Sequence, residues 1–398
     1  MANNNKHTGP NVPALRFPEF SGEWSKDCLN EFLEVQPARN TQGIYSKDDV
    51  LSVSGDYGVV NQIKLLGRSF AGKDVSNYHI VRTNDIVYTK SPLKEFPYGI
   101  VKTNQGTAGI VSTLYAVYSA KSNTDPKFVE YYFSSKERTN KYFKPIVRIG
   151  AKHDMKIGNE EVLRNIVVFP SKQEQNKIQE FLRIIDERIA TQSKIIEELN
   201  TLRSALIEEV FQSPCDTIAI GSVAYQTLER NRKSIYTNVL SVSNRYGFIN
   251  QSEQFEDRNV ASDDVRNYKI VRNGDFAYNP ARINVGSIAM LRRFDSGIVS
   301  PMYVCFRIDT SIVDPSYFEL FLKSRSFKDE MEIRLEGSVR RCLSFDAMRE
   351  IHIPCPDIKD QCTIAENIGK ISSKLELEEG ILAAYADQKA WLLNQMFI

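Results

Sequence analysis

The chain has 398 residues, of which 42% are hydrophobic and 25% are charged, and its formal net charge is +1. This composition is ordinary for a soluble globular protein, and the length fits two or more domains better than a single core. No apolar run approaches the ~18–20 residues that cross a bilayer, which argues against a membrane protein. The Asn-rich start lacks the basic-then-apolar pattern of a secretion signal. We therefore expect a disordered tail over residues 1–14 and a cytoplasmic protein.

The cysteines and histidines offer no metal site. The six cysteines include no Cys-x-x-Cys pair, and the four histidines lie far apart in the sequence. Zinc and redox sites need close ligand spacing, so we expect buried free thiols and no bound metal.

An internal repeat of about 190 residues organises the chain. Residues 50–62 recur at 239–251 with nine of thirteen positions identical, and residues 74–88 recur at 264–278 with nine of fifteen. Gly-Ile-Val-Ser at 109–112 returns at 297–300, and Asp-Pro at 125–126 returns at 314–315. The matches keep their order at a nearly constant offset, which indicates a tandem duplication.

Each copy begins with short predicted strands. β-forming runs separated by Gly, Asn and Asp lie at 50–53, 86–88 and 110–117, and again at 239–242, 276–278 and 302–308. Asp125-Pro126 and Asp314-Pro315 predict helix starts, because Asp caps a helix and Pro suits its first position. A further strand follows at 166–169 and at 351–353. We therefore predict an α+β fold with two tandem α+β domains.

A long amphipathic helix ends each copy. Apolar residues along 173–212 and 359–398 are spaced alternately by three and four, which is the seam of a coiled coil. A shift of 186 residues keeps the seam apolar and aligns its polar interruptions, Gln192 and Glu378. The seam consists of Ile178, Leu182, Ile185, Ile189, Ile196, Leu199, Ile364, Ile368, Ile371, Leu375, Leu382 and Tyr385.

Two packing arrangements would bury this seam. Related helices about a pseudo-two-fold axis present the same stripe to each other, which predicts an antiparallel coiled coil. The alternative is that each stripe packs on its own domain. At ~1.5 Å per residue, each helix would be roughly 60 Å long.

Charge differs between the predicted helices and domains. The first helix has five Lys/Arg against eight Asp/Glu, and the second has four against six. The remainder of the chain is therefore positive, which permits a basic face on each domain.

Several motifs resemble specificity (S) subunits of type I restriction-modification systems. Leu15-Arg16-Phe17-Pro18-Glu19-Phe20 followed by Trp24 is similar to their opening. Each domain also ends as theirs do, with a strand, a proline, an acidic-Gln pair and a long helix. The pairs here are Glu174-Gln175 and Asp360-Gln361, and the helix ends at 206–211 and 392–397 match as well. Cys355-Pro356 departs from the pattern by lengthening the second joint.

The resemblance implies a division of labour along nearly the whole chain. Target-recognition domains would occupy 15–172 and 213–358, and conserved spacer helices 173–212 and 359–398. The domains would read the two halves of a bipartite, asymmetric site in double-stranded DNA, and the helices would set the spacer length. The chain itself would be non-catalytic and bind no cofactor. It would assemble with two modification (methyltransferase) subunits and with restriction (ATP-dependent translocase/nuclease) subunits, which would use S-adenosylmethionine, ATP and Mg.

Candidate DNA contacts should lie where the copies diverge, because each copy must recognise a different half-site. Base and phosphate contacts require polar or basic side chains on exposed loops. The predicted contacts are Lys90, Lys152, His153, Arg245, Arg282, Asn284, Arg340 and Arg341. The alternative is that these are solvated loop charges. Tyr57 and Tyr246 are shared by both copies, so we expect them to belong to the framework.

Two other functions are weighed against DNA recognition. A scaffold that brings proteins together through the helix pair would need no basic face on the domains. A self-sufficient modification enzyme would need a cofactor loop, which is absent. Asp314-Pro315-Ser316-Tyr317 resembles an adenine-methyltransferase motif, but a helix start explains it better. Residues 67–74 nearly match a phosphate-binding loop, but Asp74 stands where Ser or Thr must bind magnesium.

Overall fold

The computed structural model describes residues 11–93, 95–149, 155–251, 264–337 and 341–398. The chain separates into two compact units, Met1–Gln192 with Ile381–Ile398, and Ser193–Gly380. Each unit therefore contains one copy of the repeat, the beginning of the long helix that follows it and the end of the other long helix.

The first unit is built on a four-stranded antiparallel sheet in the order β2-β9-β6-β7. Its strands are β2 (Leu33–Val35), β6 (Ile86–Thr89), β7 (Val101–Thr103) and β9 (Tyr115–Ala120). Four strand pairs surround it: β1 (Ser25–Cys28) with β12 (Ile166–Phe169), β3 (Leu51–Ser54) with β4 (Gly58–Asn61), β5 (His79–Val81) with β8 (Gly109–Val111), and β10 (Arg148–Ile149) with β11 (Met155–Lys156). The helices are α1 (Gln62–Leu66), α2 (Pro126–Tyr132), α3 (Lys136–Phe143), α4 (Asn159–Val162) and the beginning of α5 (Lys172–Gln212).

The central strand β6 is buried on both faces. Alternate residues of a strand point to opposite sides. Ile86 and Tyr88 join a core with α2 and α3, where the Tyr88 ring stacks on Phe143 at 4.5 Å between ring centroids. Val87 joins a second core formed with the β3–β4 hairpin and the β5–β8 pair. The hairpin is therefore fixed to the sheet by apolar packing.

The second unit repeats this plan with a four-stranded sheet in the order β14-β21-β18-β19. Those strands are β14 (Ala224–Thr227), β18 (Phe276–Tyr278), β19 (Ile288–Met290) and β21 (Val304–Ile308). The pairs are β13 (Thr217–Ala219) with β22 (His352–Pro354), β15 (Leu240–Ser243) with β16 (Gly247–Asn250), and β17 (Lys269–Arg272) with β20 (Ser296–Val299). The helices are α7 (Pro315–Phe321), α8 (Arg325–Arg334), α9 (Phe345–Arg349) and the beginning of α10 (Ile358–Gln395).

The predicted duplication and α+β fold are confirmed, with small changes at the strands. Asp125 and Asp314 cap α2 and α7 through their side chains, as expected. The predicted strand 110–117 is wrong as one element, because a turn at 112–114 divides it into β8 and β9. The shared Gly109 and Gly297 are needed for packing. An added Cβ would lie 2.5 Å from the Asp49 carbonyl oxygen in one copy and 2.5 Å from the Leu240 side chain in the other.

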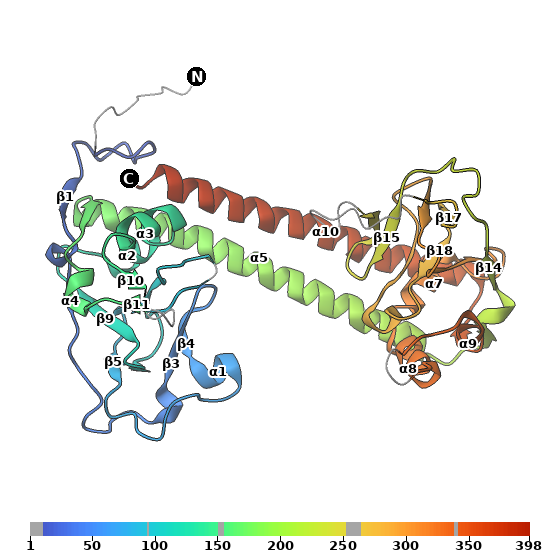
Figure 1. Ribbon diagram of the computed structural model, residues 1–398, viewed down its shortest axis with the longest axis horizontal. Coiled ribbons are helices and arrows are strands. Elements are labelled where there is room, and N and C mark those ends of the chain that lie inside the picture. Colours follow the sequence, from blue (N-terminus) through green and yellow to red (C-terminus); the bar gives the residue numbers. More distant parts are fainter. Residues whose placement is uncertain (1–10, 94, 150–154, 252–263, 338–340) are drawn as a thin grey trace. The chain divides into compact units, whose positions relative to one another are not determined.

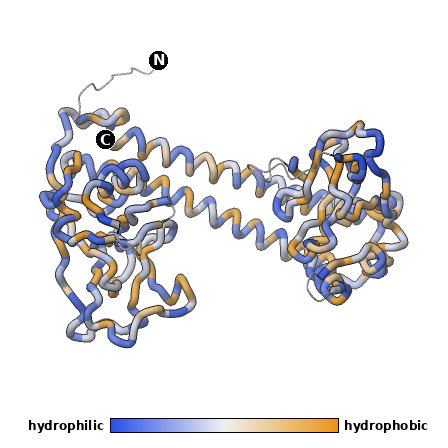
Figure 2. The backbone as a smooth tube through the Cα atoms, viewed as in Figure 1, coloured by the Kyte–Doolittle hydropathy of each residue, from blue (hydrophilic) through white to orange (hydrophobic). Residues whose placement is uncertain are grey.

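The two long helices pack together and run antiparallel, because α5 begins in the first unit and α10 ends there (Figure 1). None of the twelve predicted seam residues is exposed, and apolar residues recur along both helices in Figure 2. In its first turns, α5 also packs on its own domain, which was the alternative arrangement, since Ile178 and Leu182 join the core of the first unit.

The end of each long helix completes the core of the other copy's domain. Leu392 of α10, together with Met396 and Phe397 directly after it, lies in the core of the first unit. Ile207 and Phe211 of α5 lie in the core of the second, together with Ile368 from the start of α10. The helix ends that resemble S subunits therefore have a packing role.

All six cysteines are free thiols, but the expectation that they are buried is wrong for five of them. Only Cys305 is fully buried, and burial raises the pKa of its thiol to about 12. Cys215 and Cys362 are exposed. Within the described residues, no helix is long and apolar enough to cross a membrane.

Candidate nucleic-acid interface

The tips of the β3–β4 and β15–β16 hairpins have the same backbone and different side chains. The Ser54 hydroxyl oxygen accepts hydrogen bonds from the backbone N–H groups of Asp56 and Tyr57. In the second copy the Ser243 hydroxyl oxygen accepts from Arg245 and Tyr246 in the same way. The residues that differ, Gly55-Asp56 against Asn244-Arg245, are thus presented on one shared turn.

The shared tyrosines on these tips are exposed, at 70% for Tyr57 and 65% for Tyr246. The expectation that they belong to the packed framework is therefore wrong, because neither ring is part of a core. The guanidinium of Arg245 lies over the Tyr246 ring at 5.1 Å from the centroid. An arginine stacked on an aromatic ring is held in place while its N–H groups can still donate at the edge.

The loop between β18 and β19 carries two more predicted contacts. Arg282 and Asn284 are exposed, and the buried Ile283 between them anchors a single 3-10 turn. Gly286 ends that turn with φ +89°, a conformation that a side chain would strain. A Cβ on Gly286 would lie 3.4 Å from Cβ of Asn244, so this loop is adjacent to the β15–β16 tip. The structure therefore brings Arg245, Arg282 and Asn284 to one surface of the second domain.

Two further candidates are held by internal contacts. Lys90 is half-buried and donates to the side chain of Asn159, and burial lowers the pKa of its amine. Arg341 is exposed, but its guanidinium donates to the Glu332 carboxylate and backbone carbonyl, each at 2.9 Å. The segment after Arg341 reaches the β18–β19 loop, where Leu343 N–H donates to the Pro280 carbonyl.

Three predicted contacts, Lys152, His153 and Arg340, lie outside the described residues. Their roles stay predictions.

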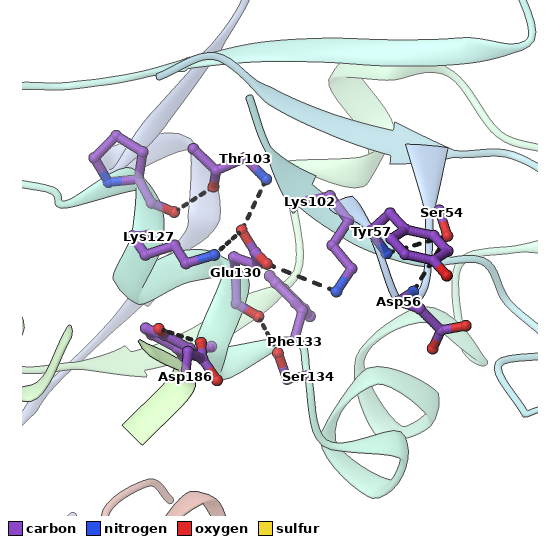
Figure 3. Close-up of polar contacts among 12 residues, drawn as sticks. Ser54, Asp56, Tyr57, Lys102, Thr103, Lys127, Glu130, Phe133, Ser134 and Asp186 are labelled. Carbon is purple, nitrogen blue, oxygen red and sulfur yellow. Dashed lines mark hydrogen bonds and ion pairs between the residues drawn. The ribbon is translucent and has the colours of Figure 1, made fainter. Parts of the chain in front are cut away.

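A charged cluster that the sequence did not reveal lies beside the first hairpin (Figure 3). The buried carboxylate of Glu130 accepts from the Thr103 backbone N–H at 3.0 Å and pairs with Lys127 at 2.9 Å and Lys102 at 3.6 Å. Burial lowers the pKa of Lys102, and Glu130 opposes that shift. Lys127 is three residues from Glu130, but Lys102 and Thr103 come from a different element, so the fold is needed to identify the whole cluster.

Three residues of the acidic-Gln pairs, Glu174, Gln175 and Gln361, fix the starts of the long helices. Glu174 is nearly fully buried and pairs with Arg16 at 2.7 Å, and it accepts from the Trp24 ring N–H at 3.2 Å. Gln175 is fully buried, where its side-chain oxygen accepts from the Asp125 backbone N–H at 2.9 Å. Gln361 makes the same contact with Asp314 in the second copy, also at 2.9 Å. These residues therefore have structural roles.

The enzyme-like motifs also have structural roles. The Tyr317 ring is buried against Phe211, and its hydroxyl donates to the Pro354 carbonyl. Gly67 ends helix α1 in the left-handed conformation, so residues 67–74 follow a helix where a phosphate-binding loop follows a strand. Among the described residues, no three His, Cys, Asp or Glu side chains are placed to hold a metal ion.

This chain is similar to known proteins in its three-dimensional structure, but no similarity in sequence was found. No protein-family model matches the chain, and no curated protein is similar to it in sequence. The type I restriction-modification S subunit from M. genitalium is 14% identical, with a TM-score of 0.57 over 97% of this chain and 99% of that one. A chain from a study of complex assembly and conformational transition of the type I R-M system is 13% identical, with a TM-score of 0.54 over 94% and 97%.

At these identities the likeness concerns the fold, and it extends over nearly the full length of both chains. The fold of this protein is that of type I restriction-modification S subunits.

Proposed function

We propose that this chain is the DNA-specificity subunit of a type I restriction-modification complex. Its two recognition domains read the two halves of a bipartite, asymmetric DNA site. The long helices set the spacer between the halves and dock the modification subunits. The chain has no catalytic activity of its own. S-adenosylmethionine, ATP and Mg act in the modification and restriction subunits.

The hairpin tips are the observation that carries this proposal. One turn geometry, held by Ser54 or Ser243, carries different residues in the two copies. To recognise two different half-sites, a duplicated protein needs the same backbone in both copies and different exposed polar residues on it. The Arg245 side chain can donate hydrogen bonds to a guanine edge or to a phosphate. The neighbouring loop with Arg282 and Asn284 extends the same surface.

The long helices support the docking part of the proposal. On α5, Ile184, Ile195 and Leu202 are exposed, and at about 100° per residue they lie on one face. On α10, Leu377 and Trp391 are exposed in a similar way. Exposed apolar residues in a row on a helix are typical of a protein-binding surface, which suits docked modification subunits.

A scaffold that does not read DNA would have the same docking surface. It would bind the modification subunit and show no affinity for double-stranded DNA. A DNA-binding measurement on the full chain therefore separates the two functions.

The recognition part is tested by Arg245→Ala. The full chain and its modification subunit are co-expressed, and methylated adenines are mapped. Losing one base contact costs about 1–3 kcal/mol, so we expect relaxed specificity in one half-site and an unchanged second half-site. Asp56→Ala is the matched variant and should change only the other half-site. A motif identical to that of the unchanged protein in both variants would show that the tips do not read DNA.

The docking part is tested by Trp391→Ala. The ring is 54% exposed, so the fold should survive its removal. Truncating a central aromatic contact typically costs 2 kcal/mol or more, which corresponds to at least roughly thirtyfold weaker binding of the modification subunit. Gln388→Ala, an exposed polar position on the same helix, is the control. Equal affinity for both variants would place docking elsewhere.

A further inference from the structure

A groove in the second unit joins the β15–β16 tip to residues outside the loops considered so far. It has a volume of about 540 Å³ and lies between the β15–β16 tip, β19, α7 and α10. Four basic residues line it, Arg245, Arg292, Arg293 and Lys323, against two acidic ones, Glu319 and Glu376. The lining is therefore positive by two charges.

The Ser316 hydroxyl and one shared carboxylate, Glu319, hold two of these cations. The Arg292 guanidinium donates to the Ser316 hydroxyl at 2.9 Å and to Glu319 at 3.1 Å. Lys323 also pairs with Glu319, at 3.8 Å. Because one carboxylate serves two cations, the positive charge of this wall is only partly compensated.

The α10 side of the groove is lined by Glu376 and by four small residues, Ala365, Gly369, Ser372 and Ser373. A glycine within a helix destabilises it, and here no packing requires one, because a Cβ on Gly369 would have no atom within 4 Å. The first copy carries Arg183 at the position 186 residues earlier, where it pairs with Glu187. The open helix surface is therefore a property of the second copy.

We propose that this groove binds the sugar-phosphate backbone of the DNA, independently of base sequence. The inference rests on the proposed function and adds the surface that makes phosphate contacts. Arginine matches phosphate with two parallel N–H donors, serine hydroxyls add further donors, and the small residues let the strand approach the helix closely. The groove is continuous with the Arg245 tip, so one DNA strand passes from the base-reading loops into it.

The substitution Gly369→Gln tests this, because it fills the groove while removing a helix-destabilising glycine. The control is Gly380→Gln, since Gly380 also lies in α10, also has no atom within 4 Å of a Cβ, and does not line the groove. Both variants should raise the melting temperature. Binding of the full chain to a mixed-sequence duplex of about 30 base pairs is then measured by fluorescence anisotropy across a salt series.

We expect Gly369→Gln to weaken binding about five- to tenfold near 0.1 M salt and to reduce the slope of log affinity against log salt by about 1–2, as for the loss of one or two phosphate contacts. Arg292→Gln should have a similar effect, and Gly380→Gln should match the unchanged chain. Equal salt slopes for Gly369→Gln and Gly380→Gln would overturn the inference and leave the proposed function standing. Loss of modification-subunit binding with unchanged DNA binding would overturn it in favour of a protein-docking groove. If the unchanged chain does not bind the duplex, both proposals fail.

Discussion

At the scale of single residues, two buried glutamines connect the start of each long helix to the α+β domain that precedes it. Gln175 accepts from the first residue before α2 and donates to the Pro170 carbonyl at 2.9 Å. Gln361 repeats this arrangement before α7, donating to the Pro356 carbonyl at 2.8 Å. The Cys355-Pro356 insertion, which departs from the S-subunit pattern, therefore still supplies a proline carbonyl that accepts from the glutamine.

We expect Gln175→Ala to destabilise the first unit. The substitution leaves the Asp125 N–H and the Pro170 carbonyl buried without partners, at a cost of about 2 kcal/mol. For a unit of this size, that lowers the melting temperature by roughly 4–8 °C, measurable by calorimetry. Gln173→Ala is the control, because Gln173 is exposed two residues away. Equal melting temperatures for the two variants would contradict the role given to Gln175.

The buried His79 should make the first unit sensitive to acid. Its ring is 4% exposed, and burial, together with Arg39 and Lys90, lowers its pKa to about 4 from 6.5. The unfolded chain therefore takes up this proton first, so the stabilising contribution is present above pH 6.5 and is lost as the pH falls toward 4. We expect a loss of roughly 2 kcal/mol between pH 7 and pH 5 from this group.

Urea unfolding at the two pH values, followed by hydrogen exchange in the β5–β8 pair, measures this effect. The variant His79→Gln should flatten the dependence. The second copy has Lys269 at the equivalent position, with its amine donating to the Tyr303 carbonyl, so it lacks this histidine and serves as the internal comparison. An unchanged pH dependence in the variant would rule out His79 as its source.

At the scale of elements, the core of each unit includes the end of the long helix that follows the other copy of the repeat. Phe397, two residues after the end of α10, is 4% exposed, and its ring stacks on Phe128 of α2 at 5.2 Å between centroids. Phe211 of α5 is packed in the same way against Tyr317 and Phe321 of α7, at 5.0 and 5.4 Å. These aromatic contacts join residues that lie far apart in the sequence, so they are long-range contacts.

We expect Phe397→Ala to destabilise the first unit by about 3–5 kcal/mol, as for a buried phenylalanine. Hydrogen exchange in α2 should accelerate more than exchange in α7. Phe211→Ala is the reciprocal variant and should reverse the order. If Phe397→Ala accelerates exchange mainly in α7, the assignment of the helix ends is wrong.

The sequence was sufficient to predict the elements whose signals are local. Asp125-Pro126 predicts the start of α2, and the apolar spacing predicts both long helices and a seam without an exposed member. The exposure of Tyr57 and Tyr246 could not be predicted, because identity between copies reports a shared constraint without saying whether it is packing. The Glu130 cluster and the groove at Gly369 each join segments far apart in sequence, so no periodicity reveals them.

At the scale of the whole molecule, the chain contains two copies of one repeat with the same packed framework. The two copies differ mainly at exposed polar positions. The framework is set by packing, as in Gly109 and Gly297, where both copies need a residue without a side chain. The differences, such as Asp56 against Arg245, lie on turns that tolerate them. Under the proposed function, recognition of the DNA sequence would depend on these exposed polar residues.

Mapping of methylated adenines across a genome is the most direct test of this account. The full chain is expressed with its modification subunit in a host that lacks other adenine methylation. The account predicts a single bipartite motif with two different half-sites and a spacer of fixed length. Scattered methylation, or none from an assembled complex, would contradict it.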